Sequence, residues 1–124
     1  MANHASGPAH IETTETFVRL YVFLSQYLDR CRDEAARRSF PEAELQAHLA
    51  ATKAKMLDIM AVNRVVKDKV AQECVRILAL GETCLKQGGA NASVVEDVKR
   101  ERAILQNKTI ALSDLLAVFR AAEN

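Results

Sequence analysis

The first apolar pattern along the chain predicts a long helix from about Glu12 to Arg38. Its apolar residues return at intervals of three, four and seven, the spacing that places side chains on one face of a helix. Val18 and Val22 lie off that face, so we expect this helix to be covered on more than one side. The main stripe consists of Phe17, Leu20, Tyr21, Leu24, Tyr27, Leu28 and Cys31.

A second and longer pattern predicts a helix over about residues 41–87. Pro41 suits a first helical turn, and Ser39 and Glu42 have the spacing of a capping box. Two heptad positions keep their phase along this segment, which is typical of a coiled-coil-like seam with Asn63 as a polar residue that fixes register. One position is Leu49, Met56, Asn63, Val70, Ile77 and Cys84, and the other is Thr52, Ile59, Val66, Glu73 and Leu80.

The third pattern predicts a helix from about Ser93 almost to the C-terminus. Gly88 and Gly89 suit the end of the preceding helix, because glycine adopts the backbone conformation of a helix C-cap at little cost. Ser93 and Glu96 form a second capping-box spacing. The apolar residues of this helix are Val98, Leu105, Leu112, Leu115, Leu116 and Phe119.

The lengths of the predicted helices leave two architectures open. At ~1.5 Å per residue the middle helix would be roughly 69 Å long, against about 40 and 43 Å for the outer two. An unbroken middle helix gives an elongated double hairpin that needs a second copy, whereas a break near Asn63 gives a monomeric four-helix bundle. We favour the unbroken helix, because the segment "IMAVNRVV" has no glycine or proline and is too apolar for a surface loop. The sequence thus predicts an all-α antiparallel bundle of three long helices, with the four-helix bundle as the alternative.

The ends of the chain and its composition indicate one domain inside the cell. Residues 1–11 are small and polar, and we expect a flexible tail there, followed by a single helical-bundle domain over residues 12–124. The start of the chain resembles neither a secretory signal nor a transit peptide, and no apolar run approaches the ~20 residues that span a bilayer. Three cysteines without paired spacing predict reduced, mostly buried thiols in a cytoplasmic protein: Cys31, Cys74 and Cys84.

The charge balance argues against nucleic acid as a partner. The chain has 17 basic and 16 acidic residues, without the basic excess that phosphate binding requires. Basic residues do outnumber acidic ones between Lys53 and Arg76, which is typical of a solvated helix flank or of a surface for an acidic protein. Nucleic-acid binding would use Lys53, Arg64, Lys67 and Lys69, but no exposed aromatic residues lie among them to stack on bases.

Catalytic motifs are not found in the sequence, and we expect neither an enzyme nor a bound cofactor or metal. No glycine-rich phosphate loop and no nucleophile with sequence support for a base partner is present. Glu44 and His48 lie one helical turn apart, but a di-metal bundle uses a different spacing twice. We therefore interpret them as a surface ion pair.

The aromatic residues of the first helix are the best candidates for a binding surface. They pack in the core or in a dimer interface, and any part that faces solvent marks a binding site. We predict partner binding by Phe17, Tyr21 and Tyr27, with Arg64 and Lys67 on a charged rim. The predicted function is that of a non-enzymatic helical adaptor or small chaperone that forms a homodimer.

A second functional hypothesis belongs to another class. In a four-helix monomer, Tyr21, Tyr27, Asn63 or Cys74 would point into an apolar cavity that binds a small molecule. A thermal-shift screen with apolar ligands would separate this hypothesis from the adaptor.

Two segments of the chain resemble a known family. The run Arg64-Val65-Val66-Lys67-Asp68 and the later residues Asp97, Val98, Lys99, Glu101, Ile104 and Leu105 resemble the helix–turn–helix of tubulin-binding cofactor A. The resemblance extends over about residues 63–118. It implies a non-catalytic chaperone that holds β-tubulin.

Overall fold

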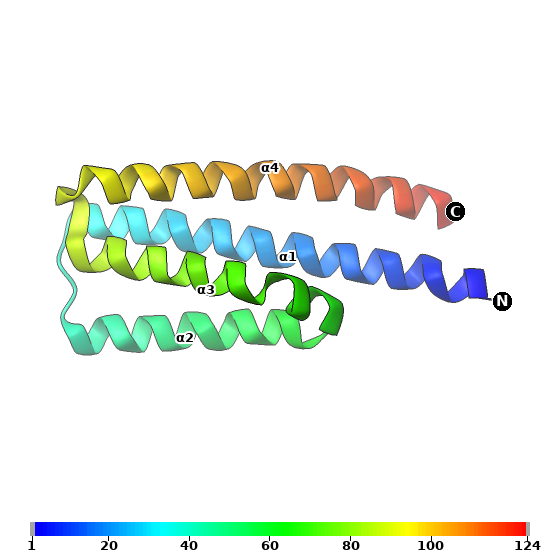
Figure 1. Ribbon diagram of the computed structural model, residues 1–124, viewed down its shortest axis with the longest axis horizontal. Helices are drawn as coiled ribbons and strands as arrows, with labels where there is room; N and C mark the ends of the chain where they lie inside the picture. Colours follow the sequence, from blue (N-terminus) through cyan, green and yellow to red (C-terminus); the bar gives the residue numbers. More distant parts are fainter. Residues whose placement is uncertain (1, 124) are drawn as a thin grey trace.

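Four α-helices, joined by short connections, make up the fold (Figure 1). The computed structural model describes the backbone of residues 2–123 and the side chains of residues 9–88 and 90–123. Within that part of the chain no strand is present, so the predicted all-α class is confirmed. The helices are α1 (Ala2–Arg37), α2 (Glu42–Ala61), α3 (Arg64–Gln87) and α4 (Ala92–Glu123), with a 3-10 turn, Gly88–Ala90, before α4.

The bundle is flattened, with α1 and α3 side by side and α2 and α4 on opposite sides of them (Figure 1). Three hydrogen bonds join α1 to α3 or its N-cap at nearly constant separations of 50, 51 and 53 residues, so these helices run parallel. α4 runs antiparallel to α1: Asp29 pairs with Arg102, and Glu15 with Arg120. The chain therefore follows an up-down-up-down path.

Small residues allow α1 and α3 to approach each other. A Cβ atom placed on Gly81 would lie 2.3 Å from the hydroxyl oxygen of Tyr27, so only glycine leaves room for that ring. The Tyr27 hydroxyl then donates a hydrogen bond of 2.9 Å to the backbone carbonyl of Leu78. The buried thiols Cys31, Cys74 and Cys84 belong to the same core.

The break between α2 and α3 shows that the expectation of three helices, with an unbroken helix over residues 41–87, was wrong. Asn63 has extended backbone angles, φ −149° and ψ 107°, and is the N-cap of α3. Its side-chain oxygen accepts hydrogen bonds from the backbone N–H groups of Val65 and Val66, and its side-chain nitrogen donates to Thr13 of α1 at 3.0 Å. Asn63 therefore starts a helix, a role for which asparagine is among the best residues.

The starts of the other helices also differ from the predictions. Pro41, not Ser39, is the N-cap of α2. The residue before a proline avoids helical backbone angles, so Phe40 cannot belong to the first turn of α2. Asn91, not Ser93, caps α4 by accepting a hydrogen bond of 3.2 Å from the Val94 N–H. α1 begins at Ala2, ten residues before the predicted start, so residues 2–11 are helical. Gly88 ends α3 with a φ of +66°, as predicted for a glycine C-cap.

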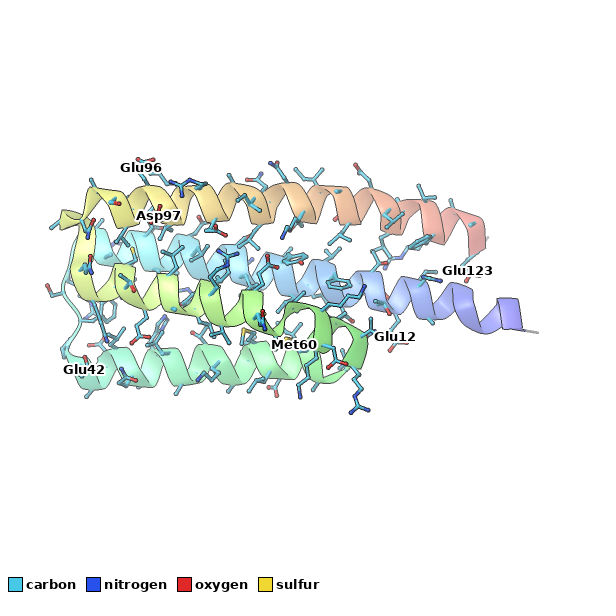
Figure 2. The ribbon with its side chains drawn as sticks, in the orientation of Figure 1. Glu12, Glu42, Met60, Glu96, Asp97 and Glu123 are labelled. Atoms are coloured by element: carbon cyan, nitrogen blue, oxygen red, sulfur yellow. The ribbon has the colours of Figure 1, made fainter. Side chains whose placement is uncertain are left out.

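α1 and α4 extend beyond the turn between α2 and α3 (Figure 1). In this overhang only these two helices face each other, near Glu12 and Glu123 (Figure 2). The ring of His10 packs against that of Phe119, with 5.7 Å between the ring centroids. One flank of α4 is consequently left without a covering helix towards its end.

Candidate functional site

Large apolar side chains are exposed on two separate parts of the surface. One group belongs to α1 and α4, and the other lies on α2, α3 and the turn between them. Clusters of this kind on a small protein indicate contact with another molecule. The first group is Val22, Ile104, Ile110, Leu115 and Val118, and the second is Leu57, Val62, Val65 and Val75.

A hollow between α1 and α4, which we call the α1–α4 hollow, brings two predicted site residues together. It has a volume of about 320 Å³ and is lined by Phe17 and Tyr21 of α1 and by Lys108, Ala111 and Leu112 of α4. The Phe17 and Tyr21 rings are stacked, with centroids 6.1 Å apart and planes inclined by 18°. This side of the hollow is therefore lined by two stacked aromatic rings.

An apolar line along α4 continues from the α1–α4 hollow. Ile104, Ala111, Leu115 and Val118 follow intervals of seven, four and three residues, which places them on one face of the helix. We call these four residues the α4 stripe. Val118 is 62% exposed and Leu115 is 42% exposed. Ala111 belongs to both the α4 stripe and the α1–α4 hollow, so the two form one continuous surface.

The charge beside this surface is neutralised within the molecule. The ammonium group of Lys108 lies 2.8 Å from a carboxylate oxygen of Glu73 on α3 and 5.5 Å from the centroid of the Tyr21 ring. Burial, and secondarily the Glu73 carboxylate, raises the pKa of Tyr21 to about 12. At neutral pH the hollow thus presents a neutral phenol and a paired lysine, which suits an apolar ligand better than a charged one.

A larger groove lies between α2 and α3 and has a volume of about 520 Å³. We call it the α2–α3 groove. Its floor and walls are mainly apolar and include three alanines, whose small side chains leave the space between the helices open. Its polar rim consists of Gln46, Lys53 and Glu82, and its apolar lining of Leu49, Ala50, Ala54, Leu57, Val75, Leu78 and Ala79.

The remaining predicted site residues lie elsewhere. Tyr27 is only 2% exposed and packs inside the bundle, so it cannot contact a partner at the surface. Arg64 and Lys67 are exposed on the first turn of α3 but line neither the α1–α4 hollow nor the α2–α3 groove. Of the five predicted site residues, Phe17 and Tyr21 therefore line the same hollow, and Tyr27, Arg64 and Lys67 lie away from it.

The four residues expected around an internal ligand cavity do not surround one hollow. Tyr27 and Cys74 belong to the packed core, and Asn63 caps α3. Tyr21 does line a hollow, but that hollow opens at the surface between α1 and α4. The interpretation of Glu44 and His48 as an ion pair was also wrong. Glu44 pairs with Arg38, and His48 stacks on Tyr27.

The thiols are held in environments that disfavour the thiolate. Cys31, Cys74 and Cys84 are buried and free, as predicted. Burial is the main cause that raises the pKa of Cys31 to about 12 and that of Cys74 to about 11, and it raises the pKa of Cys84 as well. Since the thiolate is the reactive form, these side chains act as small apolar core residues.

The described residues hold neither a metal cluster of histidine, cysteine and carboxylate side chains nor a membrane-spanning helix. No group of three or more histidine, cysteine, aspartate or glutamate side chains there is arranged to hold a metal ion. Nor does any helix there combine the length and the apolarity needed to cross a bilayer. The candidate functional sites are therefore the two apolar surfaces.

The sequence does contain a signal for the α2–α3 groove. A single long helix over residues 41–87 has one main apolar seam, whereas two antiparallel helices also form an outer face along the hairpin. Alanines at positions 50, 54 and 79 mark the separate face that a hairpin of two helices exposes. That face exists only once the chain turns at Asn63.

Comparison of this chain with models of known families, with curated proteins and with solved structures gave no match in any of the three. Its function is therefore inferred from its own surfaces.

Proposed function

We propose that this protein is a non-enzymatic helical adaptor or small chaperone that binds a partner protein through the α1–α4 hollow and the α4 stripe. The observation that carries this proposal is the continuity of the two features along α4. Phe17 forms one wall of the hollow, and Leu115 and Val118 extend the apolar surface beyond it. Removing exposed apolar side chains of this kind from water lowers the free energy, and this favours binding.

The shape of the surface favours an amphipathic helix as the bound element. The α4 stripe is straight and extends over four turns, from Ile104 to Val118, so a second helix with apolar residues three, four and seven apart can lie along it. Burying a half-exposed Leu, Ile or Val side chain contributes on the order of 1 kcal/mol. Several such contacts, with one side chain in the hollow, together contribute a few kcal/mol, which opposes the cost of association.

Affinity capture with surface variants tests this proposal. Tagged wild-type protein and the Val118→Glu variant are incubated with lysate of the source cell, and the retained proteins are identified by mass spectrometry. We expect one protein to be retained in stoichiometric amount by the wild type and to be lost with Val118→Glu, because a carboxylate on the stripe must be desolvated to bind. Purified partner should then reproduce the loss.

The matched control is Val75→Glu, which places the same charge at an equally exposed position on α3. It should retain the same partner protein as the wild type. Equal retention by Val118→Glu and wild type, or no stoichiometric partner at all, would contradict the proposal. If the resemblance to tubulin-binding cofactor A holds, the retained protein is β-tubulin.

A further inference from the structure

Three sulfur-containing side chains gather inside the hairpin of α2 and α3. The thiol sulfur of Cys74 on α3 lies 4.0 Å from the thioether sulfur of Met60, which is near the end of α2 (Figure 2). Met56 precedes Met60 by four residues, so the two methionines share one face of α2. All three side chains are at most 3% exposed, and none of them lines the α2–α3 groove or the α1–α4 hollow. We call these three residues the sulfur cluster.

The methionines of this chain are concentrated at this one place. The sequence has three of them, and the two that follow the initial Met1 are Met56 and Met60. The other buried aliphatic side chains of the core are those of leucine, isoleucine, valine and alanine. Methionine fills space at any position of a core, yet both lie one helical turn apart on the face of α2 that meets a cysteine. Soft, polarisable donor atoms are thereby brought together.

The types of donor in the sulfur cluster indicate which metal ion it suits. Thiolate and thioether sulfur atoms are the ligands that select Cu(I), whereas calcium and magnesium take oxygen ligands. A zinc site is usually completed by four cysteine, histidine or carboxylate ligands. Within the described residues no group of three or more such side chains includes Cys74. The cluster therefore suits a soft monovalent ion.

The separation of the two sulfur atoms agrees with the geometry of such a site. Two ligands that hold one ion at about 2.3 Å and enclose an angle of about 120° lie roughly 4.0 Å apart. The sulfur atoms of Cys74 and Met60 are 4.0 Å apart. The two helices are therefore at the spacing that a shared ion requires. Met56, on the same face of α2 as Met60, is the candidate for a third ligand.

Charge also favours Cu(I) over a divalent ion in this core. An ion whose charge is not compensated is costly to bury. Cu(I) would replace the proton of the Cys74 thiol, and this proton would be released to solvent. The thiolate then cancels the single positive charge, while the methionine thioethers are neutral. The loaded site has no net charge, whereas a divalent ion would leave one charge uncompensated.

We propose that Cys74, Met60 and Met56 form a binding site for Cu(I) inside the α2–α3 hairpin. The ligands come from both helices, so the bound ion would join α2 to α3 close to the turn at Asn63. α2 lies at one edge of the flattened bundle (Figure 1), where a local separation from α3 admits the ion. This proposal does not depend on the α4 stripe or on its partner.

Competition with a coloured chelator under anaerobic conditions tests the site. The full chain is titrated against the Cu(I) complex of bicinchoninate, whose absorbance gives the stoichiometry and the affinity. The wild type should bind one Cu(I) ion per chain and release one proton for each ion bound at neutral pH. The loaded protein should unfold at a higher temperature, because the folded chain binds the ion more tightly than the unfolded chain.

Substitutions of the sulfur atoms identify the ligands. Cys74→Ala should weaken Cu(I) binding by about 100-fold or more, and Met60→Leu and Met56→Leu by about tenfold or more each, since leucine keeps the volume and removes the donor. Cys84→Ala is the matched control. It removes an equally buried thiol of α3, whose sulfur lies 3.9 Å from the backbone carbonyl of Cys31, and it should bind like the wild type. Circular dichroism checks that every variant is folded.

X-ray absorption at the copper edge supplies a direct view of the ligands. It should show sulfur neighbours only, at about 2.3 Å. A folded wild type that takes up no Cu(I), equal uptake by Cys74→Ala, or a loss of uptake in Cys84→Ala would each overturn the site. Unchanged affinity in Met60→Leu or in Met56→Leu would overturn the part assigned to that methionine.

Discussion

At the residue scale, the contact between Tyr27 and Gly81 determines how closely α1 and α3 pack. The Tyr27 ring occupies the space that any other residue at position 81 would fill with its Cβ atom. Glycine inside a helix costs about 1 kcal/mol relative to alanine. That cost is offset here by the burial of an aromatic ring and by its hydrogen bond to the Leu78 carbonyl.

Gly81→Ala should therefore lower the free energy of unfolding by about 1–3 kcal/mol. The added methyl group displaces the Tyr27 ring, and the overpacking and the lost hydrogen bond outweigh the gain in helix propensity. Urea unfolding followed by circular dichroism measures the change. In a Tyr27→Leu background the same substitution should be neutral or stabilising, because the obstructing ring is gone. A loss of equal size in both backgrounds would show that the ring is not the cause.

The buried thiols give a second prediction at this scale, which concerns pH. The pKa of Cys31 is raised from 9.0 to about 12 and that of Cys74 to about 11. An acid whose pKa is higher in the folded protein stabilises the fold while it is protonated, so this stability is full below about pH 9 and is lost as the pH rises through about 11 and 12. Urea midpoints at about pH 8 and pH 10.5 measure the decline, which should be shallower in Cys31→Ala.

Labelling with a thiol reagent supplies an independent check of the same point. At about pH 8 the native protein should react only as fast as it opens, because the thiolate is disfavoured and the sulfur atoms are covered. Rapid labelling of one thiol in the folded protein would contradict the burial of that residue.

At the element scale, the short connection between α2 and α3 determines the number of helices. Its direction is fixed by Asn63, which caps α3 through Val65 and Val66 and ties the turn to Thr13 of α1. The neighbouring valines Val62 and Val65 remain exposed. This apolar turn is stable because the Asn63 side chain makes three hydrogen bonds, two to backbone N–H groups and one to Thr13.

Asn63→Ala distinguishes this structure from a continuous helix. It should lower the free energy of unfolding by about 1–2 kcal/mol, because the cap and the bond to α1 are both lost. In a continuous helix the same change would be stabilising, since alanine is the better helix former. Thermal and urea unfolding measure the sign. Asn63→Asp is the matched control: it keeps the capping oxygen and loses only the donor to Thr13, so it should be the less damaging change.

At the scale of the whole molecule, the two apolar surfaces lie on opposite sides of the α1–α3 pair. α4 is remote from α2 (Figure 1), so a molecule bound along the α4 stripe leaves the α2–α3 groove open.

The separation of the two surfaces can be tested with purified partner. Val75→Glu, in the α2–α3 groove, should bind a partner of the α4 stripe with the same affinity as the wild type, because the surfaces are separate. Titration of the partner measures both affinities, and a clear loss of affinity in Val75→Glu would contradict the separation.

The sequence predicted the fold class and much of the core, but not the number of helices or where they begin. The stripes Leu20, Leu24, Leu28 and Cys31 in α1, and Val98 and Leu105 in α4, are buried as their spacing indicated. Most heptad positions of the middle segment are buried, as predicted. The same pattern arises from one continuous helix or from two helices joined by a turn, so it did not reveal the break. A capping asparagine and a register asparagine look alike in one sequence, and the bonds of Asn63 distinguish them only in three dimensions.

The sequence by itself determined that this chain is helical, amphipathic and without a motif for catalysis, because periodicity and residue type are local properties. The tertiary structure decided which apolar residues are covered. Tyr27 is buried because Gly81, 54 positions away in the chain, leaves room for its ring, while Val75 and Val118 are exposed because no helix of this chain packs over them. Whether an apolar side chain is buried depends on which distant segment packs over it. The path of the backbone decides this, and the sequence of a single helix does not.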